Sequence, residues 1–133
     1  MESGKIKILL GDDNSVIRQG VIKSLAENFP DAEYSEASNA GEVMQRILET
    51  KYDIIILDIS MPGKDGGQVF EEMRKDPELM NIAVCIISGQ PELRRLIYKR
   101  TVPAPEGYID KPINEQNLLF NVRKILSLLH RER

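Results

Sequence analysis

Four short apolar runs, rich in β-branched residues, most constrain what this chain can fold into. They lie at residues 6–10, 54–57, 82–87 and 107–109. Runs of this length without regular polar alternation are typical of strands buried on both faces of a parallel sheet. A fifth segment, residues 32–37, alternates polar and apolar side chains, which is the pattern of an edge strand. The sequence therefore predicts a five-stranded sheet with segment 32–37 at its edge.

Segments with helical periodicity separate these strands. Their apolar stripes fall within residues 16–29, 43–48, 69–73, 93–97 and 118–129. Strands that alternate with helices predict an α/β fold, with helices on both sides of the sheet and right-handed crossovers. Because the first, third and fourth strands have the pattern of central strands, we expect the flavodoxin-like order 2-1-3-4-5 with five helices.

Composition limits the class of protein. The 133 residues fit one domain, expected to span residues 1–133. A net charge of -3 gives no general attraction to nucleic acid or to an anionic membrane, and no apolar segment is long enough to span a bilayer. Without a signal-peptide core, a cytoplasmic protein is expected. The single cysteine, Cys85, lies in an apolar run and is interpreted as a buried core thiol.

Polar residues follow four of the apolar runs, at the point where each predicted strand ends. The carboxyl ends of parallel strands share one edge of the sheet, where such folds bind ligands, so we expect these side chains to converge. Several carboxylates brought together need a counter-ion, and an all-oxygen donor set suits Mg²⁺. A carboxylate in such a site can also act as a nucleophile toward phosphorus. The residues are Asp12, Asp13, Asp58, Ser88 with Gly89, and Lys111 with Pro112.

Each of these residues also has a purely structural explanation. An acidic pair such as Asp12 and Asp13 often caps a helix, and a lone Asp at a strand end is commonly a turn residue. Lys111 taken alone is an ordinary surface lysine. Their joint placement at the ends of four different buried strands is harder to ascribe to capping, and it favours a phosphoryl-binding site.

This set of motifs resembles the receiver domain of bacterial two-component response regulators, over essentially the whole chain. The motifs are Asp12-Asp13, Asp58 with Met61-Pro62-Gly63 and Asp65-Gly66, Ser88, and Lys111-Pro112. The resemblance implies that a sensor histidine kinase or a phosphotransfer protein phosphorylates Asp58. It also implies that Asp13, Asp58 and the main-chain carbonyl of Ser60 bind Mg²⁺ directly, that Asp12 binds it through water, and that the Lys111–Pro112 bond is cis.

The resemblance further implies how the signal leaves the domain. Ser88 and Gly89 would approach the phosphoryl group, and Tyr108 would turn inward behind Ser88. The surface of the fourth helix, fifth strand and fifth helix would then change and bind a downstream protein or a second phosphorylated copy. On the fourth helix, a basic and aromatic arc forms either a docking surface or an ordinary solvated face. This arc comprises Arg94, Arg95, Tyr98 and Lys99.

Other readings are weaker. A phosphatase of the haloacid-dehalogenase type needs a second Asp two residues after its nucleophile, where this chain has Ser60. A degenerate receiver that acts only as a binding module is disfavoured, since no acidic, hydroxyl or lysine position is missing. His130, the only histidine, is interpreted as a surface residue, so a histidine phosphocarrier is not expected. We expect a signalling switch, not an enzyme that turns over free substrates.

The organisation of the chain leaves two alternatives open. No output module follows the fifth helical segment, so the chain is either a single-domain regulator or a receiver from a longer helix-turn-helix regulator. Pro103 and Pro105 are expected to stiffen the connection before the last strand. Gly66 is expected to allow a positive φ in the loop after Asp58.

Overall fold

The fold is a five-stranded parallel sheet, seen in a computed structural model that describes residues 5–61, 66–90, 92, 97 and 102–132. The strands run in the order β2-β1-β3-β4-β5, which confirms the predicted order. Each predicted strand is present, with bounds shifted by no more than one residue. Their bounds are β1 Lys7–Gly11, β2 Glu33–Ala37, β3 Ile54–Asp58, β4 Ala83–Ser88 and β5 Gly107–Asp110.

Four helices are counted among the described residues, where five were expected. They are α1 Ser15–Asn28, α2 Ala40–Glu49, α3 Gly66–Lys75 and α5 Glu115–Glu132. The remaining predicted helix, at residues 93–97, falls mostly outside the described residues. Asparagine side chains cap the start of three of these helices. Asn14 accepts from the amides of Val16 and Ile17, Asn39 from that of Glu42, and Asn114 from those of Gln116 and Asn117.

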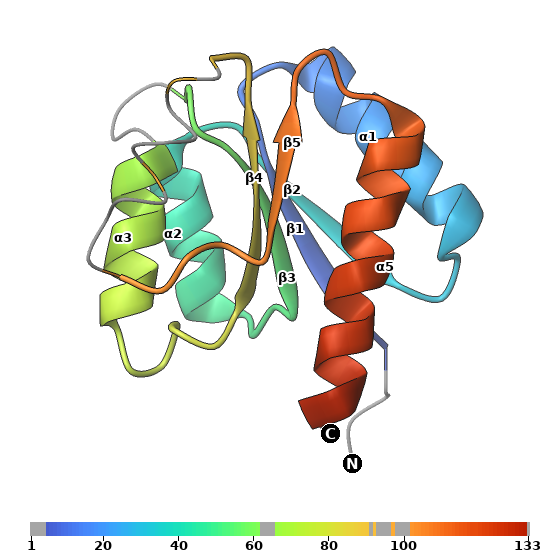
Figure 1. Cartoon of the computed structure of the whole chain (residues 1–133). Coiled ribbons are helices and arrows are strands. Elements are labelled where there is room, and N and C mark those ends of the chain that lie inside the picture. Colours follow the sequence, from blue (N-terminus) through green and yellow to red (C-terminus); the bar gives the residue numbers. More distant parts are fainter. Residues whose placement is uncertain (1–4, 62–65, 91, 93–96, 98–101, 133) are drawn as a thin grey trace.

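The helices cover the two faces of the sheet as pairs (Figure 1). Helices α2 and α3 lie on one face, and α1 and α5 lie on the other. Alternate residues of each central strand enter opposite cores, as the two-residue repeat of a strand requires: Ile55 and Leu57 pack on the α2–α3 side, whereas Ile54 and Ile56 pack on the α1–α5 side. Burial on both faces explains the unbroken apolar runs.

Two residues assigned to the apolar stripes do not face a core. Val16 is 75% exposed and Leu48 is 69% exposed. Each lies beside a residue that does belong to the core side of its helix, and neighbouring helical residues point about 100° apart. The helix can therefore bury Ile17 or Ile47 but not the apolar residue next to it.

A buried cation, Arg74, closes the amino-terminal edge of the sheet. The side chain is only 1% exposed and forms an ion pair with Glu106 at 2.7 Å. Its guanidinium donates to the main-chain oxygens of Ile82 at 2.8 Å and of Met80, Pro103 and Ala104 at 3.2 Å. Arg74 thus joins the end of α3 to the segments that precede β4 and β5.

The strand register brings the predicted site residues to the opposite, carboxyl-terminal edge. Gly11 pairs with Leu57, Asp58 pairs with Ile87, and Ser88 pairs with Asp110. The residues at or just beyond these positions therefore emerge side by side. Within the described part of the chain, no helix is both long and apolar enough to cross a lipid bilayer.

Candidate functional site

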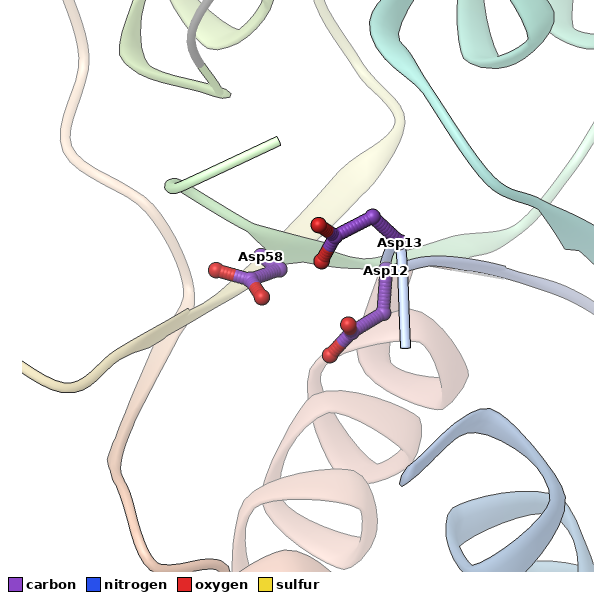
Figure 2. A group of neighbouring side chains, drawn as sticks. All are labelled: Asp12, Asp13 and Asp58. Carbon is purple, nitrogen blue, oxygen red and sulfur yellow. The ribbon is translucent and has the colours of Figure 1, made fainter. Parts of the chain in front are cut away.

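Three carboxylates converge at this edge (Figure 2). Asp12 and Asp13 follow β1, and Asp58 is the last residue of β3. One carboxylate oxygen from each residue lies within 4.8 Å of the others, a spacing at which a single metal ion can contact all three. Asp12 is fully buried and Asp58 is 1% exposed, whereas Asp13 is exposed. The structure therefore brings together the three acidic residues that the sequence predicted.

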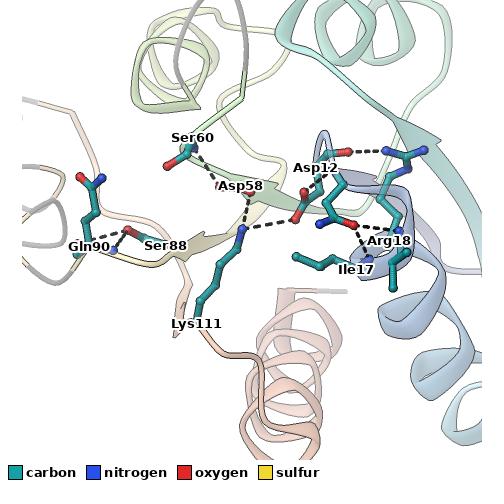
Figure 3. Close-up of polar contacts among 10 residues, drawn as sticks. Asp12, Ile17, Arg18, Asp58, Ser60, Ser88, Gln90 and Lys111 are labelled. Atoms are coloured by element: carbon teal, nitrogen blue, oxygen red, sulfur yellow. Dashed lines mark hydrogen bonds and ion pairs between the residues drawn. The ribbon is translucent and has the colours of Figure 1, made fainter.

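Lys111 is the cation that faces this group (Figure 3). Its Nζ donates to Oδ2 of Asp58 at 2.7 Å and lies 3.8 Å from Oδ2 of Asp12. Burial alone would lower the pKa of Lys111, but the hydrogen bond and charge of Asp58, together with Asp12 and Asp13, outweigh burial and raise it. Lys111 stays charged, yet it supplies one positive charge against three carboxylates. The peptide bond between Lys111 and Pro112 is cis, as predicted.

This arrangement disfavours the ionised form of Asp12. Its pKa is raised from 3.8 to about 6, mainly by burial and also by the nearby charge of Asp58, while the hydrogen bond from the Asn14 amide and the charge of Lys111 act in the opposite direction. Its Oδ1 accepts from the Asn14 amide at 2.9 Å. Its Oδ2 is buried and has no hydrogen-bond partner among the residues that the structure describes. A buried carboxylate oxygen without a donor is what a cation site requires, so the donor set fits a divalent metal.

The loop after β3 holds the Asp58 carboxylate from its other side. Oδ1 of Asp58 accepts from the amide of Ser60 at 2.9 Å, and the amide of Ile59 donates to the Ile87 oxygen at 3.0 Å. Both oxygens of Asp58 thus have a donor, one from the main chain and one from Lys111.

The prediction that Gly66 supplies a positive φ is wrong. Gly66 does not have a left-handed backbone; instead, a Cβ at this position would lie 2.5 Å from Cα of Ile59 and 2.6 Å from the Asp58 oxygen. Its amide donates to the Ile59 oxygen at 2.9 Å. Glycine is needed here because the first residue of α3 packs directly against the backbone that carries Asp58.

Ser88, at the end of β4, is buried beside this group but its hydroxyl is engaged locally. Its Oγ donates to the main-chain oxygen of Gln90 at 3.1 Å and accepts from the Gln90 amide at 3.0 Å. Gly89 faces Lys111, and a Cβ there would lie 3.8 Å from the lysine side chain. Tyr108 on β5 is 9% exposed and belongs to the core on the α2–α3 side. Ser88 would have to leave Gln90 before it could donate elsewhere.

One residue near the acidic group was missed by the sequence reasoning. Arg18, on α1, donates through Nη1 to the main-chain oxygen of Asp12 and through Nε to Oε1 of Glu36 at 2.9 Å. A signal was present, because a cation so close to the start of a helix opposes the helix dipole and calls for a specific partner. The sequence alone could not show that this partner is the loop carrying Asp12.

Several predicted residues lie outside the described residues. These comprise part of the loop after Asp58 and the proposed basic arc of the fourth helix, namely Pro62, Gly63, Asp65, Arg94, Arg95, Tyr98 and Lys99. The docking surface assigned to the arc therefore stays a prediction.

Comparisons with known proteins agree with the site. Residues 8–123 match the family model of the response regulator receiver domain. The chemotaxis protein CheY of Halobacterium salinarum is 28% identical over 121 residues, which cover 91% of this chain and 97% of that protein. The aerobic respiration control protein ArcA of Escherichia coli is 31% identical over 122 residues, which cover 90% of this chain and 48% of ArcA.

Solved structures agree on the fold. A CheY-like receiver domain protein from Methanospirillum hungatei superposes with a TM-score of 0.83 at 24% identity, over 98% of this chain and all of that one. At this identity the likeness concerns the fold alone. The match to the family model extends from β1 into α5 and includes each strand that contributes to the acidic group. The chain belongs to the response regulator receiver domain family of two-component signalling.

Proposed function

We propose that Asp58 is the phosphoacceptor of this receiver domain. The observation that carries the proposal is the setting of its carboxylate, which is buried, held by the Ser60 amide at 2.9 Å and the Lys111 Nζ at 2.7 Å, and grouped with Asp12 and Asp13. Asp12 is the more deeply enclosed neighbour and its pKa is raised to about 6, while Asp13 is exposed. Asp58 is the carboxylate that is both fixed by two donors and next to a cation.

The donor set supports Mg²⁺ as the cofactor. Asp12, Asp13 and Asp58 offer hard oxygen ligands, and the main-chain oxygen of Ser60 would complete the protein's share, with Asp12 acting through water. When bound, Mg²⁺ would neutralise negative charge on the oxygens of the transferring phosphoryl group. Oδ2 of Asp12, which has no hydrogen-bond donor among the described residues, is a buried oxygen that a bound cation would compensate.

The residues around Asp58 divide the work of phosphoryl transfer. A carboxylate oxygen of Asp58 forms the new P–O bond as the bond between phosphorus and the donor's histidine nitrogen breaks, with the electron pair left on that nitrogen. Lys111 moves from the carboxylate to the phosphoryl oxygens as a point charge. Ser88 exchanges its bonds with Gln90 for a hydrogen bond to the same group, and Gly89 leaves the loop free to follow.

The movement of Ser88 toward the phosphoryl group would also change the surface that binds other proteins. Movement of Ser88 opens space behind it for Tyr108, which lies one strand away on β5. The face formed by the fourth helical segment, β5 and α5 then changes, and with it the binding of a downstream protein or a second copy of the chain. In this role the domain is a cytoplasmic switch phosphorylated by a histidine kinase or a phosphotransfer protein, and it turns over no free substrate.

Intact mass after incubation with acetyl phosphate tests the assignment. We expect one phosphoryl adduct that requires Mg²⁺ and is absent from Asp58→Ala. Asp53→Ala, at the residue just before the amino-terminal end of the same strand, is the matched control and keeps the adduct. An adduct of equal yield on Asp58→Ala would exclude Asp58 as the acceptor. Mg²⁺ binding without any adduct on the wild type would favour a module that only binds its partners.

A further inference from the structure

We propose that Arg18 is a positioning residue that raises the affinity of the acidic group for its divalent cation, although Arg18 is itself positively charged. Through its bond to the main chain of Asp12, it fixes the peptide that leads into Asp13. The inference rests on the proposed Mg²⁺ site and concerns a residue outside the ligand set.

The main chain of Asp12 is held from two elements. Its amide donates to the Ala37 oxygen at 3.0 Å, and its own oxygen accepts from Nη1 of Arg18. Arg18 is in turn anchored to Oε1 of Glu36 at 2.9 Å. Because Glu36 and Ala37 are neighbours in β2, both contacts tie Asp12 to the same end of that strand. Arg18 therefore joins α1, β2 and the loop between β1 and α1.

This bond controls where Asp13 lies. The peptide group is planar, so fixing the direction of the Asp12 carbonyl also fixes the amide of Asp13 and the plane from which its Cα extends. Asp13 is exposed, and packing does not hold its side chain in place. Its approach to Asp58 depends mainly on the backbone that precedes it. A shift of this peptide would widen the spacing of the three carboxylates.

The charge of Arg18 is placed so that it opposes the cation weakly. Its side chain is 15% exposed and is paired with the carboxylate of Glu36. Its donors address a carbonyl oxygen and Glu36, and leave the oxygens of Asp12, Asp13 and Asp58 available. Figure 3 shows Arg18 and Lys111 on opposite sides of Asp12. Lys111 competes directly for the carboxylates, whereas Arg18 does not.

A positioning role and a purely electrostatic role predict opposite changes in Mg²⁺ affinity when Arg18 is replaced. If Arg18 acted only through its charge, its removal would relieve repulsion and tighten Mg²⁺ binding. If it positions the loop, its removal weakens binding. Arg18→Lys separates the two effects, because the charge remains but one ammonium group cannot reproduce the planar fork that bonds both Asp12 and Glu36.

Calorimetric titration of Mg²⁺ into the wild type, Arg18→Met and Arg18→Lys tests the proposal. We expect both variants to bind Mg²⁺ about 3- to 10-fold more weakly, which is less than the roughly 10- to 100-fold that residues bonded directly to a metal ligand's side chain typically contribute. Lys23→Met, which removes an exposed cation from the same helix, is expected to leave the affinity within about 2-fold of the wild type, as befits a screened surface charge. Tighter binding by Arg18→Met, or unchanged binding by Arg18→Lys, would overturn the proposal.

Phosphorylation provides a separate readout. At saturating Mg²⁺ both Arg18 variants are expected to reach the adduct level of the wild type, since positioning the loop should affect cation affinity and not the acceptor. A wild type that binds Mg²⁺ but forms no adduct would refute the phosphoacceptor role while leaving the affinity comparison intact. Should Arg18→Met fail to fold, Arg18→Lys decides alone, because unchanged affinity in that variant excludes positioning.

Discussion

Buried charge occurs at both edges of the sheet, and the two edges treat it differently. At the amino-terminal edge, the guanidinium of Arg74 donates to four main-chain oxygens and to Glu106, whose carboxylate also accepts from the Val84 amide at 2.7 Å. At the carboxyl-terminal edge, Lys111 faces a group of three carboxylates, and within the described part of the chain Oδ2 of Asp12 has no hydrogen-bond donor.

This difference distinguishes a buried charge that stabilises the fold from one that can bind a ligand. A buried charge whose partners are all present fixes the fold and leaves nothing for a ligand to supply. A buried carboxylate with a missing partner costs stability until a cation binds beside it. Altering the first kind of site should therefore destabilise the folded protein. At the second kind, removing the poorly compensated acid should stabilise it.

The largest loss of stability is expected at the amino-terminal edge, where the buried charge of Arg74 has its partners. Arg74→Met would leave the Glu106 carboxylate, the buried Ile82 oxygen and three part-buried main-chain oxygens without their donor, and should lower the free energy of unfolding by about 3 to 5 kcal/mol. Urea denaturation would measure the loss. Mg²⁺ should not restore it, because the acidic group lies at the other edge. A loss below about 1 kcal/mol would mean that water replaces the guanidinium without cost.

Lys111→Met should have a smaller effect that depends on the ligand. Without the ammonium group the buried carboxylate of Asp58 loses its charged donor, and we expect a loss of about 2 kcal/mol in the presence of EDTA. Mg²⁺ should reverse most of that loss, because a cation then takes over the same carboxylates. Equal destabilisation with and without Mg²⁺, measured by thermal unfolding, would contradict the view that this edge lacks a cation.

Asp12→Asn should stabilise the metal-free protein by about 1 to 2 kcal/mol at neutral pH, because it removes a poorly compensated buried charge. The pKa of Asp12 is about 6 in the folded protein against an ordinary value of 3.8. Between these values the unfolded chain releases a proton that the folded protein retains, so the wild type loses stability as the pH rises. The advantage of asparagine should thus be absent below the lower value, grow up to about pH 6 and stay constant above it.

Urea denaturation in EDTA across this range would show the profile. A benefit that is independent of pH would assign it to packing and not to ionisation.

Glu106→Gln, at the amino-terminal edge, is the counterpart of Asp12→Asn and should have the smallest effect on stability. The amide oxygen can still accept from Arg74 and Val84, but the charge is lost, and we expect destabilisation by about 1 kcal/mol. The sign is opposite to that of Asp12→Asn although both changes neutralise an acid. If both variants were stabilised, the contrast between the edges would not hold.

The fold and the principal site residues could be predicted because both depend on local patterns. The unbroken runs around Ile55 and Ile86 require burial on both faces, and polar residues at their ends must then share one edge. The roles of Arg18 and Arg74 could not be predicted, since each depends on carbonyl groups from distant segments that no spacing reveals. The orientation of Ser88 toward Gln90 and the close packing of Gly66 likewise depend on tertiary contacts.

The strand order has a consequence for biosynthesis. Asp12 lies near the start of the chain, whereas Lys111 follows β5, which is the last strand to be made and pairs with β4 alone. A ribosome must therefore release almost the whole domain before the lysine can reach Asp58. Until then the buried Asp58 lacks the ammonium group that donates to it, so the acidic group is complete only after β5 has paired with β4.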